Sequence, residues 1–200
     1  MRNIFAAAIL VTAVAPAAAT TFYAVTVEEL YKESSVVVSG VIQSGSKLAN
    51  DCGVAYTVWI DRAFKGADTS TKAITFQGYG PMQIGGRYYL FMSKSSDELR
   101  PIMSTNSGDM NMRAKYIEKC KSLRPPYSVN IWGNGALKVT GTYSPTVKEA
   151  IVFDQIVITP PEDLPVTELK RQDRYDNDRI DTVLNADDFA QYMNRLSTGG

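Results

Sequence analysis

The fold of this chain is decided by one alternating segment, residues 55–62, which reads Ala-Tyr-Thr-Val-Trp-Ile-Asp-Arg. The apolar side chains of Tyr56, Val58 and Ile60 fall on one face of an extended chain, and Thr57, Trp59 and Asp61 fall on the other. A period of two is typical of a β-strand with one buried face. The segment predicts a half-buried strand that ends in the following Lys-Gly turn, in a mainly β protein.

Similar segments lie on both sides of this strand. Apolar, β-branched and aromatic residues predict further strands at residues 36–43, 73–77, 87–92 and 149–159. The segments 127–132 and 136–143 flank Gly133-Asn134-Gly135, and an Asn-Gly pair between two such segments predicts a β-hairpin.

Helices are predicted at both ends of this region. Thr26 and Glu29 have the spacing of a capping box, which predicts a short helix from Val27 to about Glu33. Asn185 is the predicted cap of a final helix that carries Phe189, Met193 and Leu196 on one face. Residues 109–123 predict a further helix, and residues 166–183 a charged connecting segment.

The first nineteen residues predict export. A positive start is followed by an apolar stretch and by Ala17-Ala18-Ala19, the pattern of a cleaved signal peptide. We therefore expect a signal peptide at 1–19, a barrel domain with additional strands at 20–160, and a charged linker with a C-terminal helix at 161–200. The expected location is the periplasm or the extracellular space.

The charge and composition of the chain exclude several classes of function. The chain has 21 Lys and Arg against 21 Asp and Glu, so it lacks the basic surplus typical of nucleic-acid binding. No second apolar segment has the length of a membrane span. Because the chain contains no histidine, Ser-His-Asp and Cys-His catalysis and the usual His-containing zinc sites are excluded. We predict no catalytic residue, no cofactor and no metal site.

Cys52 and Cys120 are the two cysteines of the chain. An even pair in an exported protein is most simply one disulfide, and the alternatives are a reactive thiol or a pair of metal ligands. Neither cysteine has a CxxC partner. The sequence favours a structural Cys52–Cys120 bridge.

A short helix followed by residues 34–42, Ser-Ser-Val-Val-Val-Ser-Gly-Val-Ile, resembles the start of exported bacterial domains related to tissue inhibitors of metalloproteinases. The turn Phe64-Lys65-Gly66 and the Gly86–Phe91 strand extend the resemblance to about residue 92. It implies a five-stranded, partly open Greek-key barrel of the oligonucleotide/oligosaccharide-binding (OB) type, with an added β-hairpin and a C-terminal helix. The tissue inhibitors chelate zinc through an N-terminal cysteine. We do not expect this mechanism here, because the first cysteine of the chain is Cys52.

We expect a protein partner to be recognised by two loops, residues 47–53 and 78–85. Candidate binding residues are Lys47, Trp59 and Tyr79, the last because glycines flank it in an expected turn. The alternative for the aromatic residues is cross-strand packing.

The resulting hypothesis is a non-enzymatic exported protein-binding module. The first alternative is an inhibitor of a periplasmic or secreted hydrolase, and the second is a histidine-independent envelope hydrolase. The sequence leaves the partner and the oligomeric state open.

Overall fold

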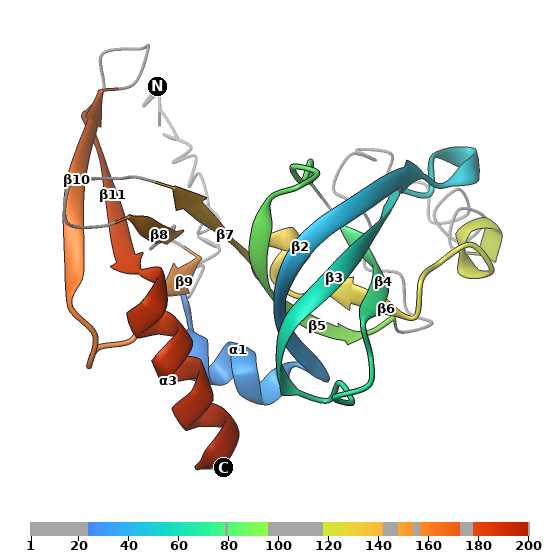
Figure 1. The fold of residues 1–200 in the computed structure, drawn as a ribbon. Coiled ribbons are helices and arrows are strands. Elements are labelled where there is room, and N and C mark those ends of the chain that lie inside the picture. Colours follow the sequence, from blue (N-terminus) through green and yellow to red (C-terminus); the bar gives the residue numbers. More distant parts are fainter. Residues whose placement is uncertain are drawn as a thin grey trace, which may run out of the picture.

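Five strands close into a barrel in the computed structural model, which describes residues 24–78, 80–95, 118–141, 148–153, 157–172 and 178–199. They are β2 (Val36–Lys47), β3 (Val54–Lys65), β4 (Ala73–Gly78), β5 (Arg87–Lys94) and β6 (Tyr127–Val129). Figure 1 shows the barrel on its right-hand side. The order is β5-β2-β3-β4-β6, and β6 also pairs with β5, so the barrel is closed rather than partly open. The predicted mainly β, OB-like fold is confirmed.

The barrel is filled by one face of each strand. In β5, Tyr88, Leu90 and Met92 belong to the barrel core, whereas Tyr89 and Phe91 belong to a second core outside it. Both faces of β5 are therefore buried, which explains why its sequence is a continuous apolar run. The buried barrel core consists of Val36, Val38, Ile42, Tyr56, Val58, Ile74, Phe76, Tyr88, Leu90, Met92 and Val129.

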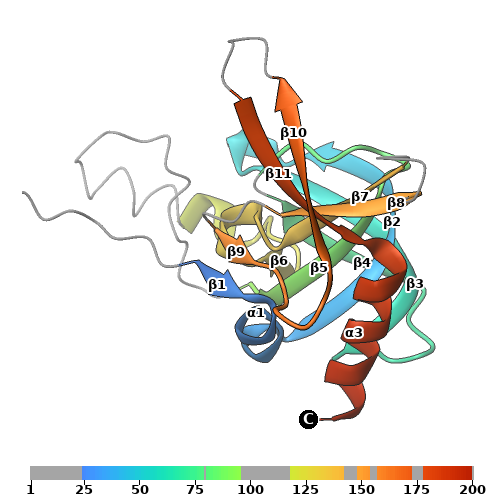
Figure 2. The same cartoon turned by 90° about the vertical axis from the view of Figure 1, so that its left-hand side faces the viewer.

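The sheet continues beyond the barrel. From β5 it extends through β7 (Ala136–Gly141), β8 (Glu149–Phe153) and β11 (Asp178–Asn185) to β10 (Val166–Gln172), giving nine strands. These pairs are antiparallel. A separate parallel pair joins β1 (Val25–Thr26) to β9 (Ile158–Thr159). Figure 1 shows β10 and β11 at the left of the molecule, away from the barrel, and Figure 2 views them from that side.

Two helices pack beside the extended sheet, and both caps follow the sequence prediction. In α1 (Val27–Glu33), the Thr26 hydroxyl accepts from the Glu29 N–H at 3.2 Å, and the Glu29 carboxylate accepts from the Thr26 N–H at 2.9 Å. In α3 (Ala186–Thr198), the Asn185 side chain accepts from the N–H groups of Asp187 and Asp188. Each cap satisfies backbone donors that have no partner within the helix.

The second core lies between these helices and the outer face of the barrel. Phe189 of α3 is fully buried, and its ring meets the Tyr89 ring edge-on at 4.9 Å between centroids. Leu30 of α1 and Ile151 of β8 belong to the same cluster. The helices thus cover the apolar side chains of β5 that point away from the barrel.

The hairpin predicted around Gly133-Asn134-Gly135 is wrong. Strands β6 and β7 both pair with β5 and are joined through η2 (Ile131–Gly133), a 3₁₀ turn. Asn134 has φ −68°, whereas the turn expected at Asn-Gly needs a positive φ there. Pairing with the long β5 strand overrides the local turn preference. An added hairpin does exist, but it is formed by β10 and β11.

Two other segments also depart from the prediction. Residues 166–183, expected as a charged connection, contain β10 and most of β11. The single strand expected over 149–159 is divided between β8 and β9, which belong to different sheets. Of the helix predicted at 109–123, residues 118–121 are helical and 109–117 lie outside the described residues, as does the predicted signal peptide at 1–19. No helix among the described residues is both long and apolar enough to cross a membrane.

Candidate functional site

Two segments meet at one end of the barrel: residues 45–53, which comprise the end of β2 and the loop before β3, and residues 80–86 between β4 and β5. We call these two segments the rim. Strand register brings them together, because Val54 pairs with Lys47 of β2 on one side and with Gly78 of β4 on the other. The Ile42 N–H also donates to the Gly86 carbonyl at 3.0 Å. The two loops in which recognition is expected are therefore neighbours in space.

Tyr56 fastens the second rim loop to the barrel. Its hydroxyl donates to the Gly80 carbonyl at 3.2 Å and accepts from the Met82 N–H at 3.1 Å. A Cβ added at Gly45 or at Gly78 would lie 2.7 Å from the Tyr56 ring. Glycine at both positions therefore leaves room for this ring, which is buried in the barrel and has its hydroxyl at the rim.

The first rim loop is shaped by its backbone. It contains η1 (Ala49–Asp51), and the Leu48 N–H donates to the Gly53 carbonyl at 2.8 Å. Asn50 has φ 60° and Gly53 has φ 102°. Both values are positive, a conformation that asparagine and glycine tolerate better than other residues. The loop is consequently a tight turn, and the side chains of Ala49 and Asn50 are exposed on it.

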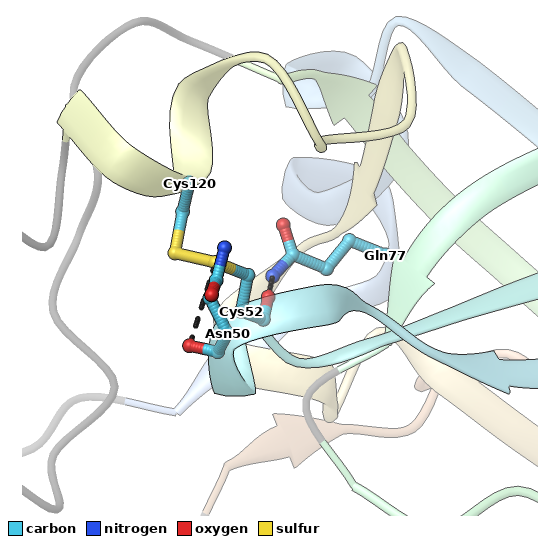
Figure 3. Close-up of a disulfide and its surroundings, with 4 residues drawn as sticks. All are labelled: Asn50, Cys52, Gln77 and Cys120. Atoms are coloured by element: carbon cyan, nitrogen blue, oxygen red, sulfur yellow. Dashed lines mark hydrogen bonds between the residues drawn. A yellow bond between two sulfur atoms is a disulfide. The ribbon is translucent and has the colours of Figure 1, made fainter.

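A disulfide anchors this loop to a distant part of the chain. Cys52 is bonded to Cys120, 68 residues away, with 5.4 Å between their Cα atoms, which confirms the predicted pair. Both cysteines are 1% exposed. Leu48 and Leu123 pack against the bridge, and Figure 3 shows it between the rim loop and the helical turn at 118–121.

Gln77 joins the same loop to the barrel wall. It lies on β4, is 1% exposed, and donates from Nε2 to the Cys52 carbonyl at 3.1 Å, as Figure 3 shows. A Cβ at Gly53 would lie 2.9 Å from the same nitrogen. A buried side-chain amide is costly unless it is hydrogen-bonded, so this contact fixes the position of the loop.

The surface of the rim is mostly uncharged. Ile84 is 53% exposed. Among the described residues, the other exposed large hydrophobic side chains are Trp59 and Val166. The Cδ1 of Ile84 is 3.7 Å from the position of a Cβ at Gly45, so Ile84 lies over the end of β2. Pro81 is exposed and Met82 is half-buried beside it. Lys47 and Asp51 are the ionisable residues in the rim sequence. This composition suits contact with another protein better than proton transfer.

The three sequence-predicted binding residues do not form one cluster. Lys47 is exposed at the end of β2, within the rim. Trp59 is 50% exposed, but it lies in the middle of β3, opposite Val41 and Ala73. Tyr79 lies outside the described residues. Lys47 is therefore at the rim and Trp59 on the outer wall of the barrel.

Three residues that matter for the rim are not among the sequence-predicted binding residues: Ile84 within the rim, and Tyr56 of β3 and Gln77 of β4, which hold it in place. Tyr56 and Gln77 were counted only as strand residues, although a polar atom at a buried strand position signals a hydrogen-bond partner. For Ile84 the sequence offers only the following Gly85-Gly86, which indicates a turn but does not show whether the side chain is exposed.

Outside the rim, charged side chains gather between the barrel and α3. Arg87 bridges two carboxylates, Asp61 at 3.2 Å and Glu149 at 3.5 Å, and all three side chains are well exposed. They border a small pocket of about 200 Å³ that also includes Tyr89. Burial raises the pKa of Tyr89 to about 12, against the lesser influence of Arg62 and Arg87. Both carboxylates are thus shared with one guanidinium at the surface.

Within the described ranges, no group of three or more His, Cys, Asp or Glu residues is placed to hold a metal ion. In comparisons with known proteins, no family model and no curated protein matches the chain.

Proposed function

We propose that this protein is a non-enzymatic exported module that binds another exported protein through the rim. The observation that carries the proposal is the bracing of both rim loops. One is held by the Cys52–Cys120 bridge and by Gln77, and the other by Tyr56. A surface that is already ordered loses little conformational entropy on binding, so a modest exposed patch can give useful affinity.

The chemistry of the patch fits this role. Ile84 is the exposed apolar centre, and the backbone beside it is held in place by hydrogen bonds between Gly85 and Ile42 and between Ile42 and Gly86. Protein interfaces combine an apolar centre with a polar surround that excludes water. The exposed polar residues Gln83, next to Ile84, and Ser46, next to Gly45, supply part of such a surround.

The proposed location and relationship rest on the sequence. The N-terminal pattern of a signal peptide supports export, and a disulfide is stable in an oxidising compartment. The resemblance to domains related to tissue inhibitors of metalloproteinases supports a role in binding, and the OB-like barrel agrees with it. Since a barrel fold alone does not fix function, the proposal depends on the rim.

Capture from exported fractions tests this proposal. The protein starting at Thr20, in wild-type form and as Ile84→Lys, is immobilised and exposed to envelope and secreted fractions, and retained proteins are quantified by mass spectrometry. The control is Gln191→Lys, which adds the same charge at an exposed position on α3. A protein retained by the wild type and the control but lost from Ile84→Lys supports the rim. A protein retained equally by all three contradicts it, and so does the absence of any retained protein.

Inhibition of a hydrolase is the second candidate, and the shape of the 45–53 loop favours it. Ala49 and Asn50 are exposed at a turn whose base is clamped by the disulfide. A narrow loop held at its base can enter a cleft without unfolding, which is how a preorganised segment could block an active site.

Inhibition assays separate the two candidates. A panel of periplasmic and secreted hydrolases is assayed with the wild type and with Asn50→Val, whose β-branched side chain opposes a positive φ. Asn50→Gly is the control, because glycine accepts this conformation. Inhibition that is lost in Asn50→Val and kept in Asn50→Gly supports insertion of the loop. If no hydrolase is inhibited while a partner is still captured, the protein acts as an adaptor.

A further inference from the structure

Strand β10 (Val166–Gln172) is the last strand of the nine-stranded sheet. One edge of β10 pairs with β11 through seven consecutive residues without a register shift. No strand in the described part of the chain pairs with its other edge. The opposite end of the sheet is closed, because β6 returns to β5. An unbroken open edge is a template for pairing with another strand.

The sequence of β10 indicates which strand fits. Residues 166–172 read Val-Thr-Glu-Leu-Lys-Arg-Gln, so that Glu168 and Lys170 are placed symmetrically about Leu169. We propose that β10 pairs antiparallel with β10 of a second copy of this chain, with a two-fold axis at Leu169. In this register Glu168 of each copy is opposite Lys170 of the other. Opposite charges facing each other across strands stabilise the pair.

Symmetry leaves few registers for such a pair. Hydrogen-bonded and non-hydrogen-bonded residue pairs alternate along an antiparallel ladder. A two-fold axis midway between two adjacent pairs would make them equivalent, which contradicts this alternation. The axis must therefore coincide with one residue, which faces its own copy.

Charge then selects among the central registers. An axis at Glu168 would place two glutamates opposite each other, and an axis at Lys170 would place two lysines opposite each other. Like charges directly opposite are destabilising. An axis at Leu169 avoids both pairs and uses all seven residues of β10. A foreign strand would need the same spacing of charges, which a second copy provides by itself.

The position of β10 allows this pairing without disturbing the rim. Figure 1 shows β10 at the left of the molecule and the rim loop at residues 48–53 at the right, beyond the barrel. Figure 2 shows β10 and β11 in front of the rest of the sheet. The dimer would extend the sheet across the two-fold axis and leave two rims available. This inference depends on β10 and holds whether or not the rim binds a protein.

Sedimentation across a range of protein concentrations tests the inference. We expect a reversible dimer for the wild-type protein and a dissociation constant roughly tenfold higher for Glu168→Lys, because two attractive pairs become repulsive. The charge swap Glu168→Lys with Lys170→Glu should restore the wild-type constant. Glu162→Lys, the same change at an exposed position outside β10, should leave it unchanged.

Each alternative outcome overturns the proposal. A wild-type protein that stays monomeric at every concentration shows that the edge does not self-associate. A dimer unaffected by Glu168→Lys uses another surface. If Glu168→Lys dissociates but the folded charge swap, checked by circular dichroism, does not recover, the register at Leu169 is wrong.

Discussion

The side-chain amide of Gln77 donates a hydrogen bond to the backbone carbonyl oxygen of Cys52 across 3.1 Å, inside the protein. The contact connects the wall of the barrel to the loop that carries the disulfide. Gln77 Oε1, by contrast, accepts no hydrogen bond from the residues that the structure describes. Gln77 therefore has a positional role that its place in an apolar strand does not reveal.

Replacing Gln77 should lower stability in a graded way. Gln77→Ala removes the donor to the Cys52 carbonyl and leaves a cavity, so we expect unfolding to cost about 3 kcal/mol less. Gln77→Leu removes the same donor but keeps most of the volume, and should cost about 1 kcal/mol. Urea denaturation followed by circular dichroism measures both. Equal losses would show that the cavity is unimportant, and no loss in either variant would contradict the structural role of the hydrogen bond.

Breaking the disulfide should also destabilise the fold. The bridge joins residues 68 apart, and closing a loop of that length restricts the unfolded chain by about 4 kcal/mol in the chain-entropy model. The double variant Cys52→Ser/Cys120→Ser should lose a stability of this order. Thiol titration of the unfolded wild type should detect no thiol before reduction and two after it. Free thiols before reduction would contradict the bridge.

Alkaline pH should destabilise the protein through Tyr89. Burial raises the pKa of Tyr89 to about 12 in the folded protein, above the usual pKa of about 10 for a tyrosine. The unfolded chain therefore loses this proton first. The stability linked to Tyr89 is complete below about pH 10 and is lost as the pH rises from 10 towards 12.

Urea titrations at several pH values measure this effect against Tyr89→Phe, which cannot ionise. We expect the stability of the wild type to decline more steeply between pH 10 and 12 than that of the variant. Parallel declines would show that Tyr89 ionises equally easily in the folded and unfolded protein.

The cap of α3 gives a further prediction. Asn185 accepts from the N–H groups of Asp187 and Asp188, so Asn185→Ala should lower stability by about 1 kcal/mol. Asn194→Ala, at an exposed position within α3, is the matched control and should have almost no effect. Thermal unfolding of both variants measures the difference. Equal midpoints would mean that the cap does not contribute.

The barrel and the two helix caps could be predicted because their signals are local. Tyr56 and Val58 alternate with polar residues, and Thr26 with Glu29 has the spacing of a capping box. Such patterns depend on residues within a few positions of each other. The disulfide followed from having two cysteines and an export signal.

The outer part of the sheet could not be predicted in the same way. Asn134-Gly135 has the sequence of a hairpin turn, but its flanking strands find a better partner in the long β5 strand. Strand β10 is rich in charged residues, and its pairing with β11 is not encoded in an apolar alternation. Both outcomes depend on contacts with distant segments, which local patterns do not contain.

The rim was only partly foreseeable. The loops were identified from their glycines and polar residues, but the sequence favoured Trp59 and Tyr79 over Ile84. Whether an apolar side chain is exposed depends on the neighbouring loop. Ile84 lies over Gly45, which belongs to strand β2, far earlier in the chain. A pattern of neighbouring residues in the sequence cannot predict this contact between Ile84 and Gly45.

Equilibrium binding of the captured partner to matched variants tests the central claim most directly. The dissociation constant is measured for the wild type, Ile84→Lys, Gln191→Lys and Trp59→Ala. Binding through the rim predicts a loss of about tenfold or more for Ile84→Lys, because a charge enters the apolar centre of the interface. Gln191→Lys and Trp59→Ala should bind as the wild type does. Unchanged binding by Ile84→Lys, or a loss confined to Trp59→Ala, would contradict the claim and, in the second case, place the interface on the outer wall of the barrel.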